Sequence, residues 1–513
     1  TISWLSSGHS TEGLVPLLKD FSFFILFLAV ATIKWDQAQI EYLGRSAIVA
    51  ILLILGFTLI NNIIPHWQGS IQNFPHNELT GRMAHQNLLA SALMLLIPIS
   101  LLAKIGMSRW LGYFAVLLAL LLIYYTHSRS ALLGVLAGIS VFAILRLAGS
   151  RLPEVAFSKR NLGTILLLIA IPLLLVQYKV LLPKVGDGKA QQSKILKTSG
   201  TEKNFTTGER LQMWAYTLAM IRDHGLLGVG PGNWKIKFPI YGSEVYRSRQ
   251  GIVQFQRPHN DYLWVWAEAG IAALLLLMGF VVSVILKGLR NLRHNNSRTE
   301  HLLLPGLVAA MVVAFFSFPR ERILHQTLFF ILAGIISSRQ EIAGASPLPK
   351  VGRQIFALGG SVLLLLTAFI AYERWRGERI TRKMISARSE HNWRELISLE
   401  RKTNELYFYN ISPAGIPMEF YSGLAYLNQK KMRLALQEYK AAHQHHPYNL
   451  QVTNNLANTF NLLDKADSAL VYYRQAIAIS PYYKEGILNL ASTYFNAGQN
   501  RKAYAILRQK AAE

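Results

Sequence analysis

The sequence has no cysteine among its 513 residues. Thiolate catalysis, zinc–thiolate sites and disulfide bonds are therefore excluded. Charged residues are also few, at 16% of the chain, and acidic ones are the scarcer kind, with 28 Asp and Glu against 53 Lys and Arg. The net charge of +25 does not indicate a nucleic-acid partner, because no basic helix or aromatic-lined surface goes with it. It indicates loop residues that set membrane topology, together with an anionic substrate.

Hydrophobic residues make up 51% of the chain and are concentrated in long blocks. An apolar stretch of roughly 18 residues or more is long enough to cross a bilayer as a helix. We therefore predict an all-α, polytopic membrane bundle of about ten spans. They are expected near residues 13–34, 45–64, 86–104, 109–126, 130–146, 161–180, 262–286, 302–319, 323–338 and 354–372. Because the chain starts at Thr1 rather than Met, we expect a trimmed N-terminus with further spans upstream.

Lys and Arg in short loops predict the side of the membrane on which each loop lies. Basic clusters occur within 146–160, 287–298 and 339–353, and the predicted spans place all three on one side, which we assign to the cytoplasm. The long segment 181–261 and everything after residue 372 then lie outside the cytoplasm. The basic residues of the long segment do not oppose this assignment, since loops of that length translocate largely regardless of charge.

After residue 372 the chain becomes polar and repetitive. Pro413, Pro447 and Pro481 recur at intervals of 34, the period of tetratricopeptide repeats. Small residues where paired helices touch, and aromatic residues between pairs, keep the same phase: Gly423, Ala457, Ala491, Ala435, Ala469, Ala503, Tyr426, Phe460, Tyr494, Tyr439 and Tyr473. Residues 414–513 thus resemble a tetratricopeptide α-solenoid, and 373–413 are expected to form a helical connector. The surface of the repeat array 414–513 is expected to bind a protein or peptide partner. The alternative is that the array is a spacer or an oligomerisation element.

The segment 181–261 is long for a loop and carries signs of structure, which is typical of functional loops. An amphipathic helix is predicted over 208–221, followed by the glycine-rich run 225–232. We interpret the glycine run as a structural turn, since no strand precedes it and no Lys-Ser/Thr follows it as in a phosphate-binding loop. Residues 1–372 are expected to form one membrane domain that includes this loop.

Short motifs occur in a fixed order along residues 80–340. They are Gly81…Asn87-Leu88-Leu89-Ala90, Ser128-Arg129-Ser130-Ala131-Leu132-Leu133-Gly134, Arg210…Trp214…Ile221-Arg222-Asp223-His224-Gly225-Leu226-Leu227-Gly228-Val229-Gly230-Pro231-Gly232-Asn233, Pro258-His259-Asn260-Asp261-Tyr262-Leu263 and Ala267-Glu268-Ala269-Gly270. The ordered set resembles the O-antigen ligase/polymerase superfamily. The resemblance implies a metal-independent membrane glycosyltransferase without a cofactor. Such enzymes transfer glycans from polyprenyl (undecaprenyl) diphosphate carriers on the extracytoplasmic face of the bacterial inner membrane.

Three residues carry the chemistry that the resemblance implies. His259 matches the family's essential histidine, the proposed base for the acceptor hydroxyl, while Arg129 and Arg210 match two essential arginines proposed to hold the diphosphate. The residue types suit these roles, because imidazole titrates near neutral pH and guanidinium offers phosphate a fork of charged donors. The predicted topology brings all three to one side of the membrane. Each residue also has an alternative without a catalytic role. His259 would be an interfacial histidine, Arg129 a snorkelling arginine, and Arg210 an ordinary charge on a helix face.

Further basic residues are candidate substrate contacts of lower rank. Arg257 and Arg249 are expected to contact phosphate or glycan; the alternative is that they are solvated loop charges. Arg320 and Glu321, with the neighbouring Arg322, follow the eighth predicted span on the same face and are expected to complete the pocket.

Polar residues around the histidine are expected to orient the site. Asn260 and Asp261 are candidates for this role, and Glu268 inside the seventh span either pairs with an arginine or snorkels to the outer surface. No metal is expected, because the acidic residues of 181–261 form no paired D-x-D or H-x-x-E arrangement. Arginines are expected to take the place of the cation.

Four functions stay open at this stage. The leading one is a ligase that joins a finished glycan to a lipid acceptor, as in lipopolysaccharide assembly. The second is a polymerase that extends the glycan on its carrier, and the third is a protein O-oligosaccharyltransferase, which the repeat tail favours. The fourth function, from another class of protein, is a transporter for the same lipid. A transporter is typically built from duplicated halves with broken spans, and the sequence shows no convincing duplication.

Overall fold

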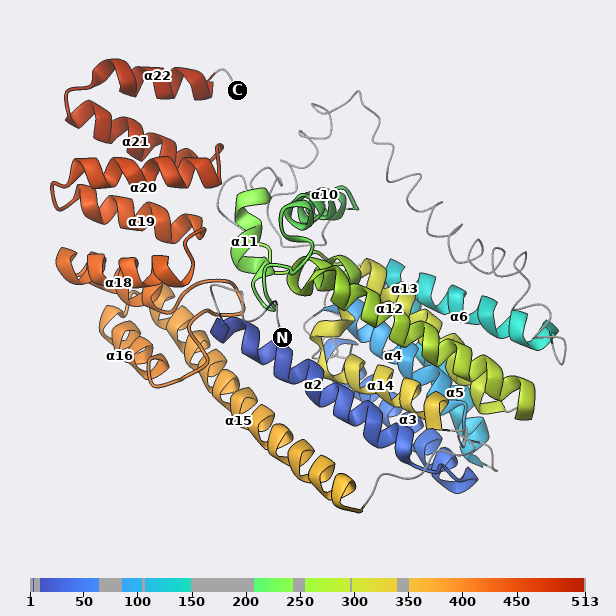
Figure 1. Cartoon of the computed structure of the whole chain (residues 1–513). Helices are drawn as coiled ribbons and strands as arrows, with labels where there is room; N and C mark the ends of the chain where they lie inside the picture. The colour runs from blue at the N-terminus through green and yellow to red at the C-terminus, as the bar shows by residue number, and fades with distance from the viewer. Residues whose placement is uncertain are drawn as a thin grey trace.

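The computed structural model describes Ser3 and residues 10–63, 85–103, 107–148, 207–242, 254–295, 298–338 and 350–511. Throughout these ranges the regular structure is helical and no β-strand occurs, which confirms the all-α prediction. Figure 1 shows a bundle of long, roughly parallel helices on one side and a stack of shorter helices, coloured orange to red, on the other.

Six helices of the described ranges are long and apolar enough to cross a membrane. They are α2 (Ser10–Thr32), α3 (Gln37–Thr58), α6 (Arg129–Ala148), α12 (Asp261–Asn295), α13 (Arg298–Phe316) and α15 (Lys350–Ser389). Three shorter apolar helices lie among them: α4 (Gln86–Ser100), α5 (Met107–Tyr125) and α14 (Ile323–Ser338). The expected span over 161–180 lies outside the described residues. The polytopic architecture is thus supported, whereas the count of ten spans is not confirmed.

Helix α13 lies inside the bundle, since 67% of its apolar stretch Thr299–Phe316 is buried by protein. It packs along α6 and α4 because small residues let the backbones approach. A Cβ at Gly134 of α6 would lie 2.5 Å from Met94 Sδ of α4 and 3.1 Å from the Ala309 carbonyl oxygen of α13. A larger residue at 134 would therefore push three helices apart.

Helix α15 joins the membrane bundle to the tail. The apolar segment expected over 354–372 is part of one helix that continues without a break to Ser389. The C-terminal part of this helix packs against α16 (Trp393–Thr403), with Met384 and Leu396 in the same core. The first part of the expected connector 373–413 is therefore helical, while the division into domains stays a prediction.

The tail consists of three consecutive helix pairs. They are α17 (Glu419–Asn428) with α18 (Met432–His445), α19 (Leu450–Asn461) with α20 (Ala466–Ile479), and α21 (Lys484–Asn496) with α22 (Asn500–Ala511). Gly423 is where α17 and α18 approach most closely, since a Cβ there would lie 2.9 Å from the Tyr439 ring. This pairing has the predicted period, while the assignment to the tetratricopeptide class stays a prediction.

The tail is attached to the membrane domain by side chains as well as by α15. Glu12 at the start of α2 pairs with Lys235 of α11 (Trp234–Tyr241) at 2.8 Å and with Arg374 of α15 at 3.4 Å. Nearby, the Asn449 amide that caps α19 donates to Gln254 Oε1 at 2.9 Å. Gln254 lies five residues before His259, so the tail contacts the segment that leads into the candidate site.

Candidate active site

Helix α10 (Thr207–His224) crosses the end of α13 and holds Arg210 against it. The Arg210 Nη1 donates to the carbonyl oxygen of Phe316 at 3.1 Å. One turn later, Trp214 Nε1 donates to the Pro258 carbonyl oxygen at 2.8 Å and its ring meets Phe315 edge-on. The helix predicted in the long loop is therefore fixed between α13 and the segment that carries His259.

His259 directly precedes the N-cap of α12. The Asn260 side chain accepts the backbone N–H groups of Tyr262 at 3.0 Å and Leu263 at 3.1 Å, which is the N-cap arrangement. His259 itself has a φ of 56°, in the left-handed region that few residues other than glycine adopt. Such strain persists where the surroundings impose it, and it is typical of functional positions.

The His259 ring is buried and lies in a positive field. Only 8% of the residue is exposed, and its ring meets Phe318 edge-on with centroids 4.7 Å apart. Burial lowers the pKa of His259 well below the ordinary histidine value, and the charges of Arg210, Arg257 and His85 lower it further. The imidazole is consequently neutral at neutral pH and able to accept a proton.

The arginines around His259 also act on one another. Burial lowers the pKa of Arg210, and nearby Arg129 adds to the effect. Burial likewise lowers the pKa of Arg257 to about 9, with a contribution from Arg322. We call the group formed by these residues the cationic cluster: Arg129, Arg210, Arg257, Arg322, His85 and His259. The structure therefore brings together the three principal residues that the sequence predicts.

Negative charge in the cationic cluster is scarce. Arg257 pairs with Glu321 and lies over the Phe318 ring, 4.4 Å from its centroid. Within the described part of the chain, Arg129, Arg210 and Arg322 form no ion pair. Like charges held together without counter-ions are costly unless an anion binds between them. The cluster therefore has the composition of an anion site.

Arg320, near the N-terminus of α12, belongs to a different network of hydrogen bonds. Its Nη2 donates to Asp20 of α2 at 2.5 Å, and its backbone N–H donates to Asp261 Oδ2 at 2.9 Å. The Lys19 ammonium donates to the Arg320 carbonyl oxygen at 3.1 Å. These carboxylates raise the pKa of Arg320 despite its burial. Arg320 is thus held by Asp20, a partner that the sequence did not suggest, and does not join the cationic cluster.

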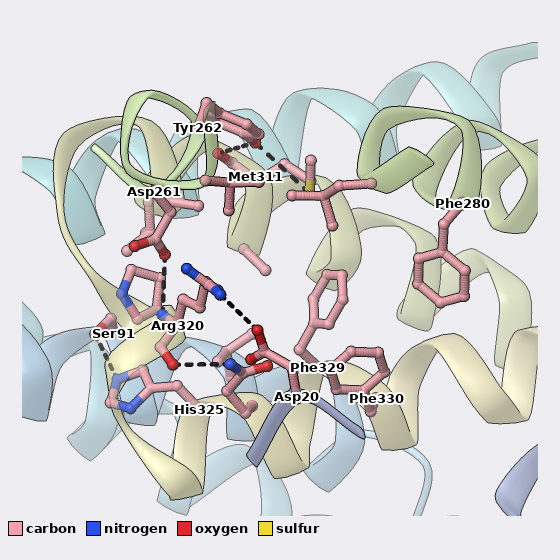
Figure 2. Close-up of a pocket in the computed structure, with 18 of the residues that line it drawn as sticks. Asp20, Ser91, Asp261, Tyr262, Phe280, Met311, Arg320, His325, Phe329 and Phe330 are labelled. Carbon is pink, nitrogen blue, oxygen red and sulfur yellow. Dashed lines mark hydrogen bonds and ion pairs between the residues drawn. The ribbon is translucent and has the colours of Figure 1, made fainter. Parts of the chain in front are cut away.

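An apolar cavity of about 600 Å³ begins at this second network. Figure 2 shows Asp261, Arg320 and Asp20 joined by dashed bonds at one end, while Phe280 and Phe330 lie at the far end. The cavity is formed by α2, α4, α12, α13 and α14, and it is lined almost entirely by apolar side chains. Its wall includes Leu276, which is 75% exposed on the outside of the bundle.

Glu268 supports the backbone of the glycine-rich turn, and the charge of Arg320 also acts on its carboxylate. Its Oε1 accepts the backbone N–H of Trp234 at 3.2 Å, and its carbonyl oxygen accepts the N–H of Gly230 at 2.9 Å. Helix α12 is kinked beside it at Gly270, where φ is 82°. A Cβ at Gly270 would lie 2.2 Å from the Leu226 carbonyl oxygen. The glycine-rich run therefore forms a turn that packs on the kink, and Glu268 stabilises that turn.

Sequence reasoning missed His85 and ranked Arg322 no higher than Arg320. His85 precedes α4 and follows residues that the structure does not describe; it lies within the Gly81…Asn87 motif but was not singled out there. For Arg322 a signal existed, because it is one of three charged residues between two apolar helices. Arg249 lies outside the described residues.

Metal ligands were also sought. Among the side chains that the structure describes, no group of three or more His, Asp or Glu is arranged to hold a metal ion. Metal independence stays a prediction, to be tested directly.

The fold and the site define a class: a multi-helix membrane protein with a buried histidine beside a group of arginines. Residues 114–278 match the O-antigen ligase family, which supports a membrane glycan ligase or polymerase. The matched region contains Arg129, Arg210 and His259, whereas His85 and Arg322 lie outside it. No curated protein matches the chain.

Proposed function

We propose that this protein transfers a glycan from a polyprenyl diphosphate carrier to an acceptor hydroxyl on the extracytoplasmic face of the membrane. One observation carries the proposal: a buried, neutral histidine lies within a cluster of arginines, three of which form no ion pair among the described residues. A diphosphate supplies the missing negative charge, and the glycosyl group attached to it is the group transferred.

In the proposed reaction, His259 accepts the proton of the acceptor hydroxyl. The acceptor oxygen forms a bond to the anomeric carbon of the glycan, and the bond from that carbon to the diphosphate oxygen breaks. The electron pair of the broken bond leaves with the diphosphate. Arg129 and Arg210 stabilise the charge that develops there, because guanidinium donors match phosphate oxygens in pairs.

The low pKa of His259 fits this sequence of events. Burial, together with the charges of Arg210 and Arg257, lowers the pKa of His259 and keeps the ring neutral. A bound diphosphate offsets the charges of Arg210 and Arg257, which raises the basicity of the ring once the donor is present. The site therefore gains its base as it gains its substrate.

The apolar cavity is suited to the first part of the carrier's hydrocarbon chain. That chain is attached directly to the diphosphate, and the cavity wall includes Asp261 and Tyr262, which follow His259 closely. Arg320 at the cavity end is already paired with Asp20, so it does not compete with the cluster for the phosphates. The cavity volume is within the range of about 300–1,000 Å³ that small-molecule sites occupy.

The acceptor divides the remaining alternatives. A ligase with a lipid acceptor is our leading proposal, and a polymerase or a protein O-oligosaccharyltransferase uses the same donor chemistry. The contact between the tail and Gln254 favours a role for the tail in presenting the acceptor. Mass spectrometry of the glycosylated product separates lipid, carrier-linked glycan and protein acceptors.

The test uses the purified full chain in lipid nanodiscs with a defined polyprenyl-diphosphate-linked glycan. His259→Ala is expected to lower the rate of transfer by about 10²–10⁴-fold, the usual contribution of a general base. The control is His391→Ala, a change at an exposed histidine in the tail. Full transfer by the His259 variant contradicts the proposal, as does restoration by magnesium of activity lost to a chelator.

A further inference from the structure

His85 has a fixed ring orientation. It is the N-cap residue of α4, and its Nδ1 accepts the backbone N–H of Asn87 at 3.1 Å. An imidazole nitrogen that accepts a hydrogen bond carries no proton, so the neutral ring bears its hydrogen on Nε2. The helix start therefore sets the tautomer of His85 and makes Nε2 a donor.

Packing between two helix starts places His85 at the cationic cluster. In the first turn of α4, the Leu88 carbonyl oxygen lies 3.1 Å from Nε2 of His325, in the first turn of α14. The Ser91 hydroxyl lies 2.7 Å from the same nitrogen. Arg322 directly precedes α14 as His85 directly precedes α4. The two residues therefore stand at the starts of joined helices, and the charge of Arg322 acts on His85.

The charges around His85 keep its ring neutral. Burial lowers the pKa of His85, and Arg210, Arg322 and Arg257 lower it further. A neutral N–H donor adds a hydrogen bond to a bound anion without adding to the repulsion among the arginines. An extra arginine at this position would carry that repulsion as a cost.

We propose that His85 is a substrate-binding residue whose Nε2–H donates to a phosphate oxygen of the diphosphate held by the arginines. This inference rests on the proposed function and assigns a further donor to the same site. His85 completes the phosphate contacts from α4, an element that lies outside the matched residues 114–278. It acts in donor binding and leaving-group stabilisation, whereas His259 acts on the acceptor.

Capping of α4 is the competing role, and substitutions separate it from binding. Ser, Asn and Asp all serve as helix N-caps. His85→Ser keeps the cap and removes the N–H donor that reaches the phosphate. His85→Asn keeps both the cap and an N–H donor. His85→Asp keeps the cap and places a negative charge against the diphosphate.

The experiment measures binding of farnesyl diphosphate to the full chain in nanodiscs by calorimetry, with thermal unfolding recorded for each variant. His85→Ser is expected to weaken binding about tenfold at an unchanged Tm, since a hydrogen bond to a charged group is lost. His85→Asn is expected to retain most of the affinity, and His85→Asp to bind more weakly than His85→Ser. His391→Ser is the matched control, and His259→Ala is expected to retain binding while it loses transfer.

Three outcomes are decisive. Equal affinity of His85→Ser and the unchanged protein overturns the role of His85 and leaves the proposed function standing. An equal loss in His85→Ser and His85→Asn, accompanied by a lower Tm, assigns His85 to capping alone. Failure of the unchanged protein and of Arg210→Ala alike to bind the diphosphate overturns the proposed function itself.

Discussion

Arg320 and Arg322 are separated by one residue, yet their surroundings differ. Arg320 is bonded to Asp20 at 2.5 Å, and its backbone N–H is bonded to Asp261, at the polar end of the apolar cavity. Arg322 forms no ion pair among the described residues and contributes to the positive field that lowers the pKa of Arg257. One arginine belongs to a satisfied structural network and the other to a site that lacks negative charge.

The difference shows how buried charge is to be interpreted in this bundle. A buried charge with a carboxylate partner contributes to the packing of the helices that hold the two partners, and breaking the pair is costly. A cluster of like charges without partners is maintained against a free-energy cost, which is typical of ligand sites. The comparison therefore predicts loss of activity when an arginine without an ion pair is replaced. It predicts loss of stability when the paired Arg320 is replaced.

The largest expected effect is on the rate of transfer, when Arg210 of the cationic cluster is replaced. Arg210→Ala is expected to reduce kcat by about 10²–10³-fold, because one donor to the leaving diphosphate is removed. Arg210→Lys restores the charge without the paired donors and is expected to recover only part of the rate. Steady-state transfer assays give the comparison, with Arg501→Ala in the tail as the control. An Arg210→Ala variant with normal kcat contradicts the assignment of the cluster to the diphosphate.

The next largest effect is on stability, when Arg320 is separated from its partner Asp20. Arg320→Met is expected to lower the free energy of unfolding by about 1–3 kcal/mol, since Asp20 and its surroundings lose a charged partner. Partial exposure of Asp20, at 39%, keeps the loss toward the lower end of that range. The Tm of the purified protein measures it, and donor affinity in the folded protein is expected to persist. Unchanged Tm with abolished donor binding would place Arg320 in the cluster and remove the contrast.

The pH dependence of transfer tests the positive field directly. Because the pKa of His259 is lowered, the acidic limb of kcat/KM is expected to lie below the ordinary histidine value of 6.5. Arg257→Gln removes one of the positive charges that act on the ring, another being Arg210. Its limb is expected to shift upward, since a weaker positive field makes the ring easier to protonate. A downward shift is incompatible with this electrostatic account.

The smallest expected effect concerns the contact between tail and site. Gln254→Ala removes the hydrogen bond to Asn449 and is expected to cost no more than about 1 kcal/mol of stability. Acceptor use is expected to fall while hydrolysis of the donor in the absence of acceptor is unaffected. Kinetics with varied acceptor concentration, compared with Gln475→Ala elsewhere in the tail, separate the two. An equal change in donor hydrolysis would mean that the contact positions His259 rather than the acceptor.

Much of the fold could be predicted because membrane helices and helical repeats are encoded locally. Apolar runs announced the spans, and prolines at intervals of 34 announced the paired helices of the tail. The sequence gives no local end signal for the helix that leaves the membrane bundle. Around residue 372 the composition changes while the helix continues to Ser389, because polar residues can follow apolar ones in one uninterrupted helix.

The candidate site could be predicted only in part from the sequence. His259, Arg210 and Arg129 are quoted positions of recognisable motifs, whereas His85 lies between the quoted residues of the Gly81…Asn87 motif and was not singled out. Glu268 was expected to pair with an arginine or face the surface; the charge of Arg320 acts on it, and its carboxylate also accepts from the backbone of the glycine-rich turn. Such contacts join residues far apart in the chain, so no local pattern reports them.

By itself, the sequence determined that this protein is a basic, all-α membrane protein, because residue types and periodicities suffice for those conclusions. The assignment of a histidine and arginines to a diphosphate came from resemblance to a family and stays a proposal. Only the tertiary structure decided which charges are satisfied. It paired Arg320 with Asp20, left Arg322 beside Arg257, and fixed the tautomer of His85 through the start of α4. The physical reason is that the cost of a buried charge depends on the partners within a few ångströms, and the partners come from different helices.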